Sequence, residues 1–431
     1  MTEKMKPSRI AWIGDIPANW KVKKIKYYTE IVNGSTPDSS DFSCWDGPIK
    51  WITPADMENT GIISKGERTL TQYGYNSCGT TMLPKGSVVI SSRAPIGKIN
   101  ITDDLLCTNQ GCKSLVSGTD NRYLYYLLLA GQEELVRLGR GTTFIELSTY
   151  DLANFGIVLP QETEQVAISD FLDAQCAKIN GVIEDIEEQI ETLQKYKKSL
   201  ITETVTKGLD RSVPMKDSGI EWIGEIPSSW KVEPIKYRVD FFNGDRGENY
   251  PSKAEMLSEG VPFINAGHLL NDGLDMENMD YISEEKYKVM GGVKLRKGDI
   301  LYCLRGSVGK NAILDINCGT VASSLVALRS RSISAKFLYY SLNSHIDEVQ
   351  RFLWDNGTAQ PNLSAENLGK FKVCIPNRQE QDIIVEFLDE KCSVVDDIVE
   401  SKTQALDTLQ QHKKSLIYEY VTGKKRVTEV N

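Results

Sequence analysis

Two short stretches of the sequence place an arginine and a lysine around a glycine turn. Residues 93–98 read RAPIGK and residues 305–310 read RGSVGK, so both follow the pattern Arg-x-x-x-Gly-Lys. A guanidinium can bond a guanine edge through two hydrogen bonds, and an ammonium can neutralise a phosphate. An ordinary hairpin with solvated charges is the alternative interpretation. The candidate contacts to a nucleic acid are Arg93, Lys98, Arg305 and Lys310.

Further polar residues occur where a chain could approach DNA closely. Short segments led by Gly141 and Gly357 are polar and flexible, as suits contact with a DNA backbone, although plain loops would look the same. An Asn-Gln pair could read adenine, but structural hydrogen bonding is the alternative because no such pair recurs later in the chain. These additional candidates are Asn109, Gln110, Thr142, Thr143, Arg246, Thr358 and Gln360.

The sequence contains no recognisable catalytic or cofactor signature. Its three histidines, His268, His345 and His412, do not show metal-site spacing. A phosphate loop, a dinucleotide-binding glycine motif and a nucleophile elbow are all missing. The simplest interpretation is a protein that binds and positions other molecules. Two alternatives stay open: a two-headed coiled-coil protein scaffold that binds no DNA, and a duplicated hydrolase or transferase with unrecognised catalytic residues.

The composition is that of an ordinary globular protein with an acidic balance. The chain has 431 residues, 40% of them hydrophobic, and a net charge of −9. The acid is concentrated, because residues 161–210 hold 11 acidic and 5 basic side chains. The rest can therefore present a basic face locally. Nine cysteines without Cys-x-x-Cys spacing favour reduced, mostly buried thiols. The chain shows neither a secretory signal nor a bilayer-length apolar run, so we expect a cytoplasmic protein.

The chain repeats itself once over nearly its whole length. Residues 12–22 read WIGDIPANWKV and residues 222–232 read WIGEIPSSWKV, with eight of eleven positions identical. The segment KKSLI also occurs twice, at 197–201 and 413–417. Offsets between matching segments drift only slightly, so the sequence predicts two copies of one unit of about 210 residues. Such a period is too long for a solenoid and indicates a domain-sized repeat.

Each copy divides into a mixed α and β part and a long helix. The runs GSVVIS (86–91) and GDILYC (298–303) are predicted strands, and residues 123–138 are predicted to be helical. After Pro160 and Pro376, glycine and proline are rare for over 40 residues. Apolar residues there recur at steps of four and three, which is typical of a coiled coil. Lys197 and Lys413 interrupt the two seams at equivalent positions, either as snorkelling side chains or as polar contacts that set the register.

These observations predict an α+β fold with two α/β domains in tandem. Each domain is followed by a long helix, and the two helices pair as an antiparallel coiled-coil spacer. The predicted boundaries are 1–160 and 211–376 for the two domains, 161–210 for the first helix, and 377–431 for the second helix with a C-terminal tail.

The ordered set of motifs resembles the specificity subunit of type I restriction–modification systems. The set runs from the Trp-Ile-Gly segment through the Arg-x-x-x-Gly-Lys turn and Pro-x-x-x-Glu-Gln to a helix ending in KKSLI, and it occurs in both copies. The resemblance implies that the two α/β domains are target recognition domains. It also implies a non-catalytic chain that binds double-stranded DNA at a bipartite, asymmetric site. It also implies two methyltransferase subunits and restriction subunits as partners. S-adenosylmethionine, ATP and magnesium would then bind to the partners and not to this chain.

The first turns of the two long helices carry a second set of candidates. Carboxylates at this position stabilise the positive end of a helix dipole, which is the structural interpretation. Contact with a modification subunit is the functional one. The candidate partner-binding residues are Glu164, Gln165, Glu380 and Gln381.

Overall fold

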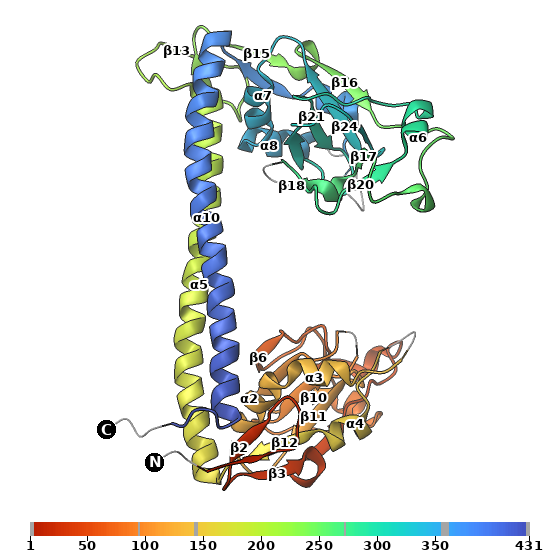
Figure 1. Cartoon of the computed structure of the whole chain (residues 1–431), viewed down its shortest axis with the longest axis vertical. Coiled ribbons are helices and arrows are strands. Elements are labelled where there is room, and N and C mark those ends of the chain that lie inside the picture. Colours follow the sequence, from red (N-terminus) through yellow and green to blue (C-terminus); the bar gives the residue numbers. More distant parts are fainter. Residues whose placement is uncertain (1–3, 94, 142–144, 271–272, 355–361, 428–431) are drawn as a thin grey trace. The chain divides into compact units, whose positions relative to one another are not determined.

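The computed structural model describes residues 4–93, 95–141, 145–270, 273–354 and 362–427 of the chain. The chain forms two compact units, one of residues 1–186 with 404–431 and the other of residues 187–403. Both units combine small sheets with helices (Figure 1). The predicted α+β class is thus confirmed. Among the described residues, the structure contains no helix long and apolar enough to cross a membrane.

The first unit is built around a five-stranded sheet in the order β4-β11-β8-β9-β6. Only the β6–β9 pair of this sheet is parallel. Its strands are β4 (Glu30–Asn33), β6 (Thr60–Ile63), β8 (Val88–Ser91), β9 (Ile99–Thr102) and β11 (Cys112–Val116). The smaller sheets use β1 (Met5–Pro7), β2 (Asp15–Pro17), β3 (Lys21–Lys24), β5 (Trp45–Ile52), β7 (Thr69–Leu70), β10 (Cys107–Thr108) and β12 (Gly156–Leu159). The predicted strand at 86–91 is confirmed as β8.

Helices of the first unit bury their apolar faces against these strands. They are α1 (Gln72–Asn76), α2 (Arg122–Ala130), α3 (Gln132–Arg137), α4 (Thr149–Asn154), the first part of α5 (Glu162–Lys207) and the last part of α10 (Arg378–Val421). The helix predicted over 123–138 is interrupted at Gly131, which separates α2 from α3. A Cβ at this glycine would lie 2.9 Å from Trp12 and 3.1 Å from Phe155. Close packing against two aromatic rings therefore requires glycine at the point where the helix bends.

The second unit repeats this plan with a four-stranded sheet in the order β16-β24-β21-β22. The strands of this sheet are β16 (Val239–Asn243), β21 (Ile300–Cys303), β22 (Asn311–Ile313) and β24 (Leu325–Ser330). The other strands are β13 (Met215–Asp217), β14 (Glu225–Pro227), β15 (Lys231–Pro234), β17 (Val261–Ile264), β18 (Leu269–Leu270), β19 (Gly273–Leu274), β20 (Asp280–Ile282), β23 (Thr320–Val321) and β25 (Lys372–Ile375). The helices are α6 (Glu284–Val289), α7 (Ala335–Leu342), α8 (His345–Trp354), α9 (Ala365–Gly369), the first part of α10 (Arg378–Val421) and the last part of α5.

The long helices α5 and α10 run antiparallel wherever they meet within a unit. In the first unit, Lys413 Nζ donates to Asn180 Oδ1 at 2.7 Å. In the second unit, Lys197 Nζ lies 2.6 Å from both carboxylate oxygens of Asp396. The predicted antiparallel pairing is confirmed, and both seam lysines make polar contacts across the helix pair.

The apolar stripe on the long helices is wider than the coiled-coil seam, and the additional apolar residues differ in how deeply they are buried. Ile201 is buried in the core of the second unit, where α5 ends against the globular part. Val182, Val394 and Ile398 are 46%, 51% and 40% exposed. The extra apolar residue at the end of α5 therefore packs into a globular core, whereas these three positions are about half exposed.

In each unit the repeated Trp-Ile-Gly segment joins the beginning of one long helix to the end of the other. Trp20 is fully buried, and its indole Nε1 donates to the Glu164 carboxylate at the start of α5. Gly423, just beyond α10, has a positive φ of 72°, and a Cβ there would lie 3.2 Å from the Trp20 ring. A left-handed glycine lets the helix end closely against the indole. The second unit uses Trp230, with Glu380 of α10 and Gly208 after α5, in the same way.

Candidate nucleic-acid interface

The second Arg-x-x-x-Gly-Lys stretch forms the turn between the antiparallel strands β21 and β22. Arg305 is exposed two residues after the end of β21, and Lys310 is half-buried just before β22. Gly306 and Gly309 have φ values of 77° and 93°, in the left-handed region that favours glycine. The glycines of the motif therefore shape the turn, and the arginine and lysine lie at its two ends.

Arg305 and Arg246 lie on the same hollow of the second unit, about 260 Å³ in volume. The other lining residues are Asn243, Leu304, Asn362, Leu363, Ser364 and Ala365. Arg246 Nη2 donates to the Ser323 carbonyl at 3.3 Å. Two guanidinium groups beside asparagine and serine side chains are suited to bind phosphate or guanine edges. The fold thus brings together two candidates that are separated by 59 positions in the sequence.

The corresponding arginine of the first unit has an acidic partner. Arg93 Nε donates to Glu146 Oε2 at 3.1 Å, and Lys113 Nζ lies 3.5 Å from the other oxygen of that carboxylate. Isolated bridges pair Arg93 with Glu146 and Arg305 with Asn362, so an acid in one unit takes the place of an amide in the other. Equivalent positions in the two units therefore differ in charge.

Lys98 has its ammonium group occupied within the chain. Its Nζ donates to the carbonyls of Pro54 at 2.9 Å and Met57 at 2.6 Å, and the side chain is half-buried. This geometry supports the structural interpretation for Lys98, because a lysine must leave both carbonyls to reach a phosphate. A DNA contact at this residue stays a prediction.

The Asn-Gln pair lies beside the loop that follows β4. Asn109 Oδ1 accepts from the Gly111 amide at 2.9 Å, and the exposed Gln110 contacts the Thr36 hydroxyl. A Cβ on Gly34 would lie 2.2 Å from the Asn109 carbonyl, so the two loops approach closely only because residue 34 is glycine. Asn109 therefore supports its own turn, and Gln110 is placed on the surface of a loop cluster.

Four candidates, Thr142, Thr143, Thr358 and Gln360, lie outside the described residues.

The Glu-Gln pairs at the helix starts have their observed partners inside the chain. Gln165 is buried, accepts from the Tyr28 hydroxyl at 2.9 Å and donates to the Pro160 carbonyl at 3.1 Å. Gln381 is also buried and accepts from the Ser334 amide at 2.7 Å. These bonds fix the first turn of each long helix, together with the tryptophan contacts of Glu164 and Glu380. Contact of the four residues with another subunit stays a prediction.

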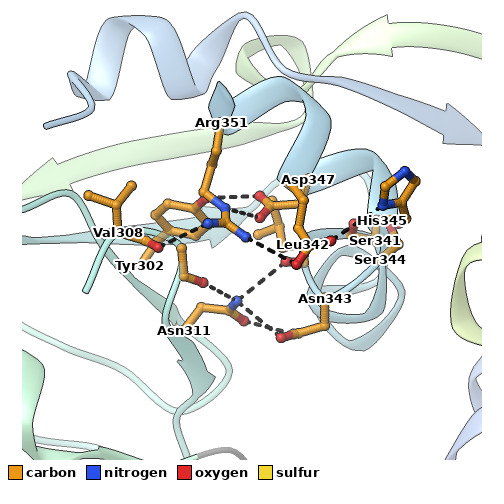
Figure 2. A network of polar contacts seen from close by, with 12 residues as sticks. Tyr302, Val308, Asn311, Ser341, Leu342, Asn343, Ser344, His345, Asp347 and Arg351 are labelled. Carbon is orange, nitrogen blue, oxygen red and sulfur yellow. Dashed lines mark hydrogen bonds and ion pairs between the residues drawn. The ribbon is translucent and has the colours of Figure 1, made fainter. Parts of the chain in front are cut away.

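Sequence reasoning missed a buried polar network beneath the β21–β22 turn (Figure 2). Asp347 on α8 is 2% exposed, accepts from the Tyr302 hydroxyl at 2.8 Å and pairs with Arg351 Nε at 2.7 Å. Burial raises the pKa of the Asp347 carboxyl to about 6, against the lowering effect of Arg351. The spacing of an aspartate four residues before an arginine was the available signal, but it is common on exposed helices.

The comparison with known families gives a single consistent answer. The family model described as "Type I restriction modification DNA specificity domain" matches residues 17–192 and again 227–411. The chain therefore belongs to this family of DNA specificity domains, and it carries two copies. This match supports the DNA-specificity function and not the DNA-free scaffold.

Individual relatives agree over nearly full length. The chain is 29% identical to the "Type I restriction enzyme MjaIX specificity subunit" of Methanocaldococcus jannaschii, over 97% of this chain and 96% of the relative. It is 21% identical to the "Type I restriction enzyme EcoBI specificity subunit" of Escherichia coli, over 94% and 86%. A chain solved under the description "Structural basis underlying complex assembly and conformational transition of the type I R-M system" is 16% identical, with a TM-score of 0.67 and coverage of 95% and 99%. That structural likeness supports the fold.

Proposed function

We propose that this chain selects a two-part, asymmetric DNA sequence for a type I restriction–modification complex. Each recognition domain, within 1–160 and 211–376, would read one half of the site. The helices within 161–210 and 377–431 would act as the spacer. A single observation carries the proposal. The two units share one scaffold, but they present different polar groups at equivalent positions. The Arg305 turn lies in a hollow with a second arginine, whereas Arg93 is paired with Glu146. Equal scaffolds with unequal contact groups suit two different half-sites.

The chain itself would contribute binding and positioning, and its partners the chemistry. Two modification subunits would methylate adenine with S-adenosylmethionine, and restriction subunits would use ATP and magnesium. Affinity for DNA would come from local cation clusters and not from the net charge, which is −9. Because phosphate contacts release counterions, binding of such a cluster falls steeply with salt.

The test is selection of bound sequences from a pool of random duplexes by the chain in complex with its modification subunit. We expect a motif of two unlike halves separated by a fixed gap. Arg305→Ala should flatten base preference in one half, by about tenfold at a guanine contact. Arg246→Ala should weaken binding in the same hollow.

Lys297→Ala is the matched control in the same unit. Lys297 is exposed at the opposite end of β21 and pairs with Asp315. Its loss should leave the selected motif unchanged. Selection of no motif by the wild-type complex, with the modification subunit bound, would contradict the proposal.

A further inference from the structure

The turn that carries Arg305 is held from beneath by a charged side chain. Arg351 Nη1 on α8 donates to the Val308 carbonyl at the top of the turn, at 3.2 Å. A Cβ on Gly309 would lie 2.4 Å from Arg351 Nε. Glycine at this position therefore lets the guanidinium pack directly against the turn backbone, as Figure 2 shows for Arg351 and Val308.

Arg351 is in turn fixed by a buried acid. Asp347 lies one helical turn earlier on α8, pairs with Arg351 Nε at 2.7 Å and accepts from the Tyr302 hydroxyl at 2.8 Å. Tyr302 belongs to β21, the strand that leads into the turn. A charge buried with a charged partner and a hydroxyl donor is costly to separate, so the guanidinium has one favoured position. The network thus connects strand, helix and turn.

The far side of the turn has its own support. Asn311 Nδ2 donates to the Gly309 carbonyl at 2.9 Å, and Asn343 Nδ2 donates to Asn311 Oδ1 at 2.9 Å (Figure 2). The amide pair anchors the return to β22, and Arg351 anchors the top of the turn. Removal of the guanidinium should therefore loosen residues 306–309 without releasing β22.

In the equivalent turn of the first unit, a neutral amide takes the place of the arginine. Gln132 Nε2 donates to the Gly97 carbonyl at 2.6 Å, and a Cβ on Gly97 would lie 2.6 Å from Val136. That turn reads Ala-Pro-Ile-Gly, and Pro95 limits its backbone freedom. The second turn reads Gly-Ser-Val-Gly and has no proline. A sequence with two glycines loses more conformational entropy when it is ordered, so it depends more on an external anchor.

We propose that Asp347 and Arg351 are positioning residues for DNA recognition by the second domain, because they hold the Arg305–Lys310 turn in its binding conformation. This inference rests on the proposed function. It assigns to the α8 pair a role in specificity that is exercised through Arg305 and not by contact with DNA.

The experiment compares Arg351→Met with Asp347→Asn, in complex with the modification subunit. Hydrogen–deuterium exchange measures the turn, and selection from random duplexes measures base preference. We expect exchange at residues 306–309 to become about tenfold faster, while β24 keeps its protection. Base preference should flatten in the half of the motif that Arg305→Ala also flattens, and the other half should stay sharp. A purely structural role would lower affinity for all duplexes alike.

Arg137→Met is the matched control. Arg137 is an exposed arginine on α3 of the first unit and pairs with its helix neighbour Glu134. Its loss should change neither half of the motif. If Arg351→Met and Asp347→Asn both fold and keep the full motif while Arg305→Ala loses one half, the positioning role is refuted. A wild-type complex that selects no two-part motif would overturn the proposed function, and this inference with it.

Discussion

Asp347→Asn should remove a specific pH dependence from the stability of the chain. The Asp347 carboxyl is 2% exposed, and burial raises its pKa from an ordinary value of 3.8 to about 6. The charged groups that face it are Arg351 and Glu348 on α8, together with the neutral Tyr302 hydroxyl of β21. Lys198 of α5 pairs with Glu348 and partly offsets its charge. Among these effects burial is the largest, so the folded chain binds the Asp347 proton more tightly than the unfolded chain.

The sign and size of the effect of pH on stability follow from the difference between the folded-state and unfolded-state pKa of Asp347. A raised pKa in the folded state stabilises the fold below the unfolded-state pKa, and this stabilisation is lost as the pH rises through the folded-state value. With about 6 in the folded and 3.8 in the unfolded chain, the full contribution is about 3 kcal/mol. Between pH 4.5 and pH 7.5 the loss amounts to about 2 kcal/mol.

Urea denaturation of the wild type and Asp347→Asn at these two pH values measures the effect. All other titrating groups are shared, so they cancel in the comparison. The free energy of unfolding of the wild type, relative to the variant, should fall by about 2 kcal/mol from pH 4.5 to pH 7.5. An equal difference between the two proteins at both pH values would refute a raised pKa for Asp347.

Three further outcomes follow from packing and exposure. Trp230→Phe should lower the free energy of unfolding by about 2–4 kcal/mol in urea titrations. The change removes a hydrogen bond from the Glu380 carboxylate and leaves a void in the core. An effect below about 0.5 kcal/mol would contradict the role of this bond. Lys413→Met should change stability by less than about 1 kcal/mol in the same assay, since its contact is exposed. Maleimide at pH 8 should label the exposed Cys318 long before the buried Cys112, whose pKa is raised to about 12 by burial; equal rates would contradict the buried placement.

The repeats, the strand and helix types and the antiparallel helix pair could be predicted because they depend on local pattern. Strand β8 and strand β21 follow turn glycines and are rich in β-branched and apolar residues, as expected. The need for glycine at position 131 could not be predicted, because the two rings that approach it belong to Trp12 and Phe155, which are remote in sequence. The division of α5 and α10 between two compact units was likewise not evident from the seam, whose spacing of four and three continues along each helix.

The candidate site was only partly predictable, because its contacts join residues that are remote in sequence. The Arg-x-x-x-Gly-Lys motif predicted Arg305 as a candidate, but the hollow that it shares with Arg246 depends on the tertiary fold. Glu146 lies 53 positions from Arg93, so the acid that distinguishes the two units has no local signal. Asp347 was missed because an acidic residue on an amphipathic helix usually faces water. Ion pairs between residues that are remote in sequence therefore could not be predicted from the sequence.

The most direct test of the central claim is a genome-wide map of adenine methylation. The chain and the modification subunit of its system would be expressed in a host that lacks adenine methylation. We predict a two-part asymmetric motif with a fixed gap, methylated in both halves and lost when this chain is omitted. Methylation that is unchanged without the chain, or absent while the two proteins remain bound to each other, would contradict its role as the DNA-reading subunit.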